Sequence, residues 1–572
     1  MNFQNFYAHE QFSEHMYVIT ESYSMVHRFS IGCIIGSRKV LVIDAGLGMT
    51  GDLRKYVESI VGTDKPIICA CTHSHPDHVG AACLFDQAYC SSLDFPGPMD
   101  PFDPISRFMD LTDFSLESTL VMEYCKENMI RDNRTTFADI KDHDVFDLGD
   151  IQVEAIAVPG HTPGSMAFYC EQENWCFTGD AINTDIHLKR MNRKDFAVYK
   201  MTMENFISRV KEDVTLFPYH LPLPMDLQIA RNLALIADEL SRGENIEGDP
   251  PCNGIFHARK NDPNIRGHYR NNTCIVYNRA NIALPGQTFD KYSCCYYSHE
   301  KISDRVYTIT INYSTVNRIT LMVFVGDEKN LLIDSGHGID GRLKDYVHSI
   351  TGSNRPIILA CTHVGIDHAG GAILFDEVYL HENDIQKLPL SKNKRYIDAQ
   401  PFSNYSQEFA EYSLEYMLDP IMPGQCRPIK DGDVFHLGNL DVACIFTPGH
   451  STGHMAFYCA SEKIAFTGDA MNTDTHLKGI DRAELEKYPA MLDQFLSRIS
   501  TDTVLYSSHL NRPNGLRVPL GIKKACLEIL AGKTKGDPQG EAIQQHIDAF
   551  HNPHIKMHFS GLCCVVYNSS LL

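Results

Sequence analysis

A cluster of imidazoles and one carboxylate is the feature of this 572-residue chain best suited to chemistry. The hexapeptide His73-Ser74-His75-Pro76-Asp77-His78 places three histidines and one aspartate within six residues. Imidazole nitrogens combined with carboxylate oxygens favour a borderline divalent cation such as zinc, iron or manganese. We therefore predict a metal site in this segment.

The residues before the hexapeptide predict how it is positioned. Residues 66–72 form a nearly continuous apolar run, which is typical of a buried strand. The histidines would then lie at the carboxyl end of that strand. Alternate residues of an extended segment share a face, so His73 and His75 can reach one ion together. Pro76 ends the strand, and a helix is expected over 78–86.

Three further polar residues each follow an apolar run at a turn. They are His161 in Pro159-Gly160-His161-Thr162-Pro163-Gly164, Asp180 after Thr178-Gly179, and His220 after Tyr219. A site built from loops at strand ends needs ligands in such places. A single histidine after a strand is more often structural, so their order and spacing after the hexapeptide make them candidates.

The chain repeats itself at an offset of 289 or 290 residues. Leu41-Val42-Ile43-Asp44-Ala45-Gly46 matches Leu331-Leu332-Ile333-Asp334-Ser335-Gly336, and the run 166–170 recurs at 455–459. We expect two domains, 1–282 and 292–572, joined by a linker over 280–287. Within each half, short apolar strands alternate with helical patterns, which predicts an α/β layered fold.

The second copy of the hexapeptide has lost one histidine. It reads His363-Val364-Gly365-Ile366-Asp367-His368, with Gly365 at the position of His75. The second half keeps six of the seven candidate ligands, so the binding of one ion there is left open. We predict that the first half is the catalyst and that the second half is an internal pseudo-dimer partner. The retained residues are His363, Asp367, His368, His450, Asp469 and His509.

This series of motifs resembles the metallo-β-lactamase superfamily, whose HxHxDH loop is followed by a distant His, an Asp and a final His. The resemblance covers both halves and implies a four-layer αβ/βα sandwich in each, with two divalent metal ions at the edge of the sheets. Zinc is the expected metal, and iron or manganese are alternatives. The resemblance implies that His73, His75 and His161 bind one ion, that Asp77, His78 and His220 bind the other, and that Asp180 bridges them.

The motif around His161 is similar to the glyoxalase II and acyl-homoserine lactonase branches, although Ser165 stands where those branches usually carry another histidine. The predicted reaction is hydrolysis of a small ester, thioester, lactone or amide by a metal-bridging hydroxide. Asp77 would orient that hydroxide or pass a proton, and Asp180 would complete the catalytic pair. Asp44 is a candidate hydrogen-bond partner of a metal-binding histidine, and a plain strand-terminating aspartate is the alternative. Tyr219 is a candidate oxyanion donor, but simple packing is the favoured role.

Composition limits the partners of the protein. A formal net charge of −21 argues against binding nucleic acid or anionic lipid, because phosphate contacts require clustered Lys and Arg. We expect a small-molecule substrate, no membrane partner, and an intrachain pseudo-dimer with further homo-oligomerisation left open. The first ten residues lack the features of a signal peptide, so a cytoplasmic location is expected. The 19 cysteines are expected to be reduced.

Other functions fit parts of the pattern. A phosphodiesterase or nuclease of the same superfamily suits the metal ligands but conflicts with the acidic charge. A diiron oxygen or nitric oxide reductase is disfavoured by His75 and by the lack of a flavin-binding domain. A non-catalytic metal- or ligand-binding regulator is consistent with Gly365. Residues 92–135, which depart most from their counterpart, are expected to form a helical cap or a partner-facing surface.

Overall fold

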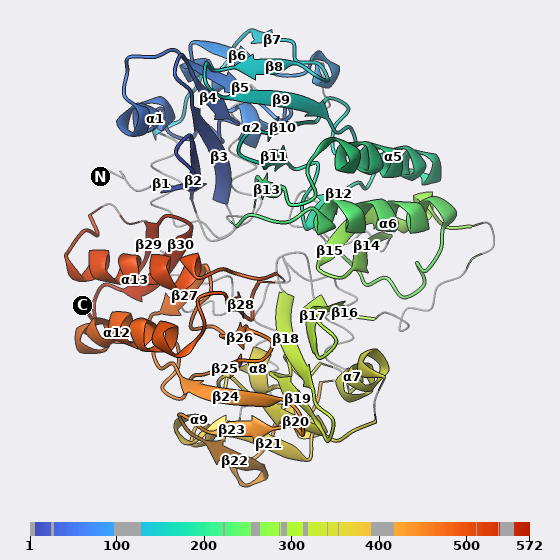
Figure 1. The fold of residues 1–572 in the computed structure, drawn as a ribbon, viewed down its shortest axis with the longest axis vertical. Coiled ribbons are helices and arrows are strands. Elements are labelled where there is room, and N and C mark those ends of the chain that lie inside the picture. Colours follow the sequence, from blue (N-terminus) through green and yellow to red (C-terminus); the bar gives the residue numbers. More distant parts are fainter. Residues whose placement is uncertain are drawn as a thin grey trace. The chain divides into compact units, whose positions relative to one another are not determined.

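The computed structural model describes residues 6–23, 28–95, 127–220, 223–252, 264–284, 287, 295–312, 318–339, 341–352, 354–389, 417–510, 512–535, 537 and 554–572. The chain divides into two compact units (Figure 1). One unit comprises Met1–Asp249 with Gly254–Phe289, and the other comprises Pro250–Asn253 with Asp290–Leu572.

The first unit contains three sheets whose order positions the predicted ligands. Strands β1 to β4 of the first sheet pair antiparallel and β4 to β7 pair parallel. This seven-stranded sheet contains β1 (Tyr7–Gln11), β2 (Met16–Ser22), β3 (Arg28–Ile35), β4 (Val40–Ile43), β5 (Ile67–Ala70), β6 (Gln87–Tyr89) and β7 (Phe137–Ala138). The second sheet has the order β13 (Thr215–Pro218), β11 (Trp175–Gly179), β10 (Met166–Cys170), β9 (Gln152–Ala157) and β8 (Val145–Asp147). A small third sheet has the order β12 (Asp185–His187), β15 (Thr273–Asn278) and β14 (Ile265–Arg270).

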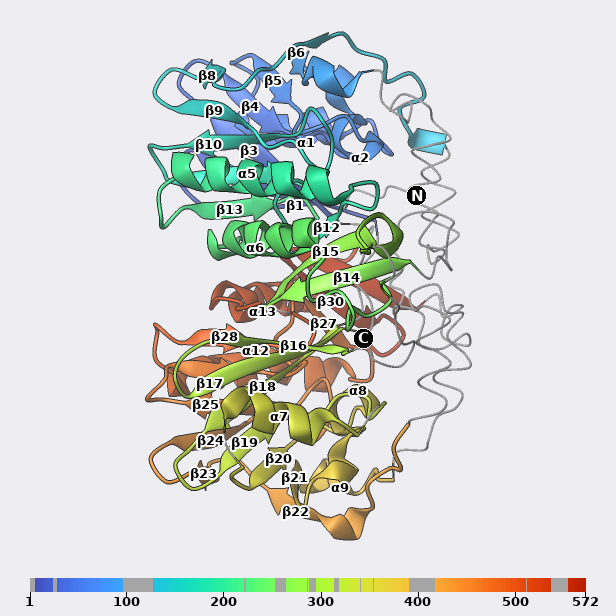
Figure 2. The ribbon, with the colours of Figure 1, turned by 90° about the vertical axis from the view of Figure 1, so that its right-hand side faces the viewer.

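Helices cover the outer faces of both larger sheets (Figure 1). Helix α1 (Leu53–Val61) places Leu53 and Val57, four residues apart, in the core beside the seven-stranded sheet. Helices α5 (Arg193–Arg209) and α6 (Gln228–Arg242) lie side by side against the five-stranded sheet (Figure 2). Each helix buries its apolar stripe, so the unit is an αβ/βα sandwich.

The second unit repeats this architecture. Its seven-stranded sheet has the order β16 (Tyr297–Lys301), β17 (Val306–Asn312), β18 (Arg318–Val325), β19 (Asn330–Ile333), β20 (Ile357–Ala360), β21 (Glu377–His381) and β22 (Cys426–Ile429). Its five-stranded sheet has the order β23 (Val434–His436), β24 (Asp441–Phe446), β25 (Met455–Cys459), β26 (Ile464–Phe466) and β28 (Val504–Tyr506). Its three-stranded sheet has the order β27 (Asp474–Leu477), β30 (Cys563–Asn568) and β29 (Ile555–Ser560). Its helices are α7 (Leu343–Thr351), α8 (Ile366–Ala369), α9 (Glu382–Ile385), α12 (Arg482–Arg498) and α13 (Arg517–Leu530). One buried apolar cluster lies between its two larger sheets and a second lies under α7.

The fold confirms the predicted two-domain α/β sandwich and the strand before the hexapeptide, but the helix expected over 78–86 is wrong. Helix α2 spans only Pro76–Val79, and a short 3-10 turn follows at Ala82–Leu84. The amide of Gly80 donates to the carbonyl of Gly46 at 2.9 Å, so it is not available to continue the helix. The segment that contains Gly46 therefore ends α2 early.

Two other expectations concern cysteines and the predicted cap. All 17 cysteines in the described part of the chain are free thiols. Cys71 is fully buried in the apolar core beside the seven-stranded sheet and does not face the predicted ligands. Most of the 92–135 segment lies outside the described residues.

Of the helices that the structure describes, none is long and apolar enough to cross a membrane.

Candidate metal centre

The predicted ligands of the first half converge because four strands end at the same edge. His73 follows β5, His161 follows β9, Asp180 follows β11 and His220 follows β13. His75 precedes α2 with extended backbone angles, φ −67° and ψ 151°, and Pro76 begins the helix. Residues that are 147 positions apart in sequence, such as His73 and His220, are thereby brought into one site.

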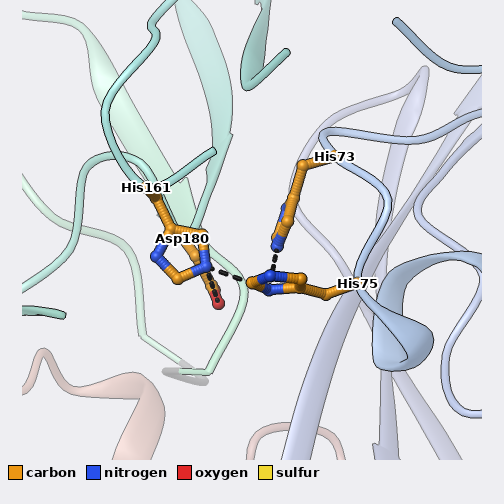
Figure 3. A group of neighbouring side chains, drawn as sticks. All are labelled: His73, His75, His161 and Asp180. Carbon is orange, nitrogen blue, oxygen red and sulfur yellow. Dashed lines mark hydrogen bonds and ion pairs between the residues drawn. The ribbon is translucent and has the colours of Figure 1, made fainter. Parts of the chain in front are cut away.

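The first metal set comprises His73, His75 and His161 together with Asp180 (Figure 3). His73 Nε2 lies 2.9 Å from His75 Nδ1, and His161 Nε2 lies 3.1 Å from the same Nδ1 atom. His161 Nε2 is 3.6 Å from Asp180 Oδ2. The side chains point toward a common centre, His73 and His75 from one loop and His161 and Asp180 from two others, as the spacing of His73 and His75 predicted.

The second metal set comprises Asp77, His78 and His220 together with Asp180. His220 Nε2 lies 3.3 Å from Asp77 Oδ2 and 3.2 Å from Asp180 Oδ2. His78 Nε2 lies 3.5 Å and 3.6 Å from the same two oxygens. Asp180 Oδ2 therefore contacts histidines of both sets, which is the position of a bridging ligand.

These residues fit a divalent metal ion. Ligand atoms 2.0–2.2 Å from a tetrahedral ion lie about 3.4 Å apart, and the second metal set has spacings of 3.2–3.6 Å. Among the described residues, the buried atoms His78 Nε2 and Asp180 Oδ1 have no hydrogen-bond partner. Buried polar atoms are seldom left so, and a cation would satisfy both.

The electrostatic environment favours bound positive charge. Burial lowers the pKa of His73 well below its ordinary value, and the neighbouring histidines lower it further. Burial alone would also lower the pKa of His78, but Asp44, Asp77 and Asp180 together raise it well above its ordinary value. The field of these carboxylates attracts a proton in the same place where a metal cation would be held.

Asp44 orients ligands of both sets from outside. Its Oδ2 lies 2.9 Å from His78 Nδ1, so it fixes which nitrogen of that ring faces the centre. Its carboxylate also accepts hydrogen bonds from the backbone amide of Thr72 at 2.7 Å and from the Thr72 hydroxyl at 2.9 Å. The Thr72 hydroxyl in turn lies 3.2 Å from His73 Nδ1. This confirms the predicted contact of Asp44 with a candidate ligand.

Asp94 joins the two loops that carry the first metal set, and the sequence reasoning missed it. It is 4% exposed and accepts hydrogen bonds from the amide of Ser74 at 3.1 Å, the hydroxyl of Thr162 at 3.1 Å and the amide of Gly164 at 2.6 Å. Ser74 lies between His73 and His75, and Thr162 follows His161. The repeat offers a signal for it, because Asp384 in the second half accepts from the amide of Val364 at 2.9 Å.

Glu21 is a second residue that sequence reasoning missed. It is completely buried and accepts hydrogen bonds from the hydroxyls of Tyr7 at 3.1 Å and Tyr23 at 2.6 Å, and from the amide of Leu47 at 3.1 Å. Burial raises its pKa to about 7. The second half has Ile311 at the corresponding position, so this buried carboxylate belongs to the first half only.

The structure supports packing, and not an oxyanion contact, as the role of Tyr219. Its side chain is 1% exposed, its ring packs on His78 at 3.8 Å between centroids, and its hydroxyl donates to the backbone carbonyl of Asp77. A hydroxyl used in this way is not placed to stabilise an oxyanion. Tyr219 instead supports the segment that contains Asp77 and His78.

Residues 183–189, which recur in the second half as 472–478, contain strand β12. Its β12 pairs in parallel with β15, and His187 ends it. Burial lowers the pKa of His187 well below its ordinary value, and charges on Lys189, His161 and His220 contribute to the same shift. His187 ends a strand whose pairing with β15 gives the segment a structural role.

The second half brings together its own candidate ligands. His363 and His450 meet Asp469 in one group, and Asp367, His368 and His509 meet Asp469 in another. No side chain occupies the position of His75, because that residue is Gly365.

Comparisons with known proteins agree with this site. The sequence profile of the metallo-beta-lactamase superfamily matches residues 30–241 and 315–494. The human acyl-coenzyme A thioesterase MBLAC2 is 23% identical over 223 residues, which cover 36% of this chain and 78% of that protein. A hydroxyacylglutathione hydrolase of Chelativorans sp. (strain BNC1) is 34% identical over 126 residues, which cover 20% of this chain and 48% of that protein. A solved metallo-beta-lactamase from Pontibacter korlensis has 18% identity and a TM-score of 0.29, covering 40% of this chain and 99% of its own.

A TM-score this low supports no conclusion, so the fold assignment rests on the family match and the sheet topology. Buried histidines and aspartates at strand ends of an α/β sandwich define the class as a metallo-hydrolase. Since the profile matches two regions that together exceed half of the sequence, the chain belongs to the metallo-β-lactamase superfamily.

Proposed function

We propose that the first half is a dinuclear metal-dependent hydrolase acting on a small acyl substrate, with thioesters as the leading substrate class. The observation that carries this proposal is the position of Asp180 Oδ2, within 3.2–3.6 Å of histidine nitrogens from both metal sets. A complete pair of sets sharing one carboxylate suits two ions, and zinc is the proposed metal.

Each ligand has a proposed task. His73, His75 and His161 would hold one ion, Asp77, His78 and His220 the other, and Asp180 both. Two such ions, when bound, supply a Lewis acid for the scissile carbonyl and lower the pKa of a coordinated water. The Asp77 carboxylate, held by the Tyr219 contact to its backbone, would take up the proton that the attacking water releases.

The choice of thioesters rests on the relatives. One is named as an acyl-coenzyme A thioesterase and another as a hydroxyacylglutathione hydrolase, and both names describe release of an acyl group from a carrier. Oxygen esters, lactones and amides share the same electrophilic carbonyl and are the other members of the class. The protein would act as a soluble cytoplasmic enzyme on a small molecule, with its second half as an internal partner domain.

The test compares matched substrates and matched variants. Metal-replete protein is assayed with a thioester and an oxygen ester of the same acyl group, with a lactone, an amide and an aryl phosphodiester. His75→Ala should lower kcat/KM by more than about 100-fold, because even contacts outside the ligands cost 10- to 100-fold. His368→Ala in the second half should leave kcat/KM near that of the wild type.

Equal losses from His75→Ala and His368→Ala would refute the assignment of catalysis to the first half. Cleavage of the phosphodiester alone would favour a phosphodiesterase, and the formal charge of −21 argues against that outcome. No turnover of any of these substrates would favour a ligand-binding regulator.

A further inference from the structure

The second half retains a set of four ligand atoms with the spacing of a tetrahedral metal site. His368 Nε2 lies 3.4 Å from both Asp367 Oδ2 and Asp469 Oδ2. His509 Nε2 lies 3.5 Å and 3.2 Å from the same two oxygens. Ligands about 2.1 Å from a tetrahedral zinc ion would be about 3.4 Å apart. The four atoms therefore surround a space of the size of one such ion.

His368 adds an independent indication that this space binds a cation. The residue is completely buried, and within the described ranges its Nε2 atom has no hydrogen-bond partner, so neither carboxylate contact has hydrogen-bond geometry. Its Nδ1 atom lies 2.8 Å from Asp334 Oδ2. A proton on Nδ1 shared with Asp334 leaves the lone pair of Nε2 directed at the centre of the four atoms.

The other metal position of this half is incomplete. Gly365 has backbone angles close to those of His75, φ −59° and ψ 145°, so a histidine is conformationally allowed there. A Cβ atom at Gly365 would, however, lie 2.7 Å from His363 Nε2. The His363 ring thus occupies the space where a side chain at this position would begin. His454 stacks on that ring at 5.2 Å between centroids and accepts a hydrogen bond from the Asp469 amide at 3.2 Å.

The shared carboxylate also differs between the halves. Asp469 Oδ1 accepts a hydrogen bond from the Asn472 side-chain amide at 3.1 Å. In the first half, Asp180 Oδ1 has no hydrogen-bond partner among the described residues, and the corresponding Asn183 instead accepts from the amide of Thr184. Asn472 therefore holds the Asp469 carboxylate through Oδ1, and Oδ2 faces His368 and His509.

We propose that the second half binds a single divalent cation of the zinc type through Asp367, His368, Asp469 and His509, as a structural metal site. The first half pairs the corresponding four residues with a second set that contains three histidines. The second half lacks one of those three because Gly365 replaces His75, so its single ion would have no partner ion. The ion would link the loops after β20, β26 and β28, and its removal would destabilise this half without affecting hydrolysis.

The test counts metal ions on the full-length chain by mass spectrometry after removal of loosely bound metal. Wild type should hold about three ions per chain, and His368→Ala about two, with kcat/KM of the first half unchanged and a lower thermal unfolding midpoint. The matched variant His75→Ala/His78→Ala removes ligands of both sets in the first half. It should lose hydrolysis and keep about one ion.

Cobalt(II) provides a readout that does not depend on activity. In the His75→Ala/His78→Ala protein, the remaining ion should give the intense visible absorption of four-coordinate cobalt(II), and adding His368→Ala should abolish it. Loss of all metal from His75→Ala/His78→Ala, as the properly folded protein, would refute the site. A weak six-coordinate spectrum, or two ions retained in that variant, would refute the single tetrahedral shell.

Discussion

Replacing Asp94 tests whether metal binding depends on a carboxylate that touches no metal ligand atom. Asp94→Asn keeps the size of the side chain but leaves one oxygen where the carboxylate has two. The amide can accept from Gly164, or from Ser74 and Thr162, but not from all three donors. The loops carrying His75 and His161 should then lose part of their common anchor.

The expected size of the effect follows from those contacts. Hydrogen bonds to a charged group contribute about 1.5–3 kcal/mol each, and at least one is lost. If about 2 kcal/mol of the lost hydrogen-bond energy serves to hold His75 and His161 in place, the metal affinity of the first set falls about 30-fold. A change of about 1.4 kcal/mol in binding free energy changes the affinity by a factor of ten. Such a loss lies within the 10- to 100-fold typical of residues that support metal ligands.

The assay titrates metal against a chromophoric chelator and measures kcat/KM at several free metal concentrations. Asp94→Asn should lose activity at low metal and regain most of it at high metal. Asp384→Asn is the matched control, because the same buried carboxylate anchors the corresponding loops of the second half. It should leave hydrolysis unchanged. Wild-type metal affinity and kcat/KM in Asp94→Asn would refute the reasoning.

Three further predictions concern buried charges. Burial raises the pKa of Glu21 from 4.5 to about 7. The contribution of Glu21 to stability is therefore complete below about pH 4.5 and declines by about 3 kcal/mol as pH rises through 7. Glu21→Gln should remove that part of the change in unfolding free energy between pH 5 and pH 8, and an unchanged pH dependence would contradict the prediction. His268 lies between the carboxylates of Asp249 and Glu239 at 2.8 and 2.9 Å, and its pKa is raised to about 10, burial being outweighed by both partners. The stabilisation of the protein by charged His268 is complete below about pH 6.5 and is lost as pH rises through 10. His268→Gln should therefore lower the free energy of urea unfolding by about 3–5 kcal/mol at pH 6 and by less at pH 10. Asp44→Asn should weaken metal binding by about 10- to 100-fold in the same chelator titration. Unchanged affinity would show that His78 does not need the Asp44 contact in order to bind metal.

Much of the candidate site could be predicted because its ligands have distinctive types and order. The hexapeptide, His161, Asp180 and His220 each follow a short apolar run, and the internal repeat shows the same order twice. The apolar run before the hexapeptide likewise predicted β5. These are local properties of the chain, since strand and helix patterns depend on residues close in sequence.

The supporting contacts could not be predicted in this way. Asp94 and Glu21 are single acidic residues whose sequence neighbours give no sign of burial, and their partners lie as far as 70 positions away. The early end of α2 is of the same kind, because an amide bond to Gly46 decides it rather than helix propensity. Tyr219 is a related case, since the sequence left both packing and an oxyanion contact open and only the folded structure shows where its hydroxyl points.

The amino-acid sequence alone was therefore sufficient for the family, the candidate ligands of the first half and the missing histidine of the second. Folding was needed to show what the loss of that histidine means. Whether a side chain has room at Gly365 depends on the His363 ring, which lies 2.7 Å from where its Cβ would be, and on His454, which stacks on that ring from a separate loop. Such contacts depend on how strands stack at one edge, which no local pattern specifies.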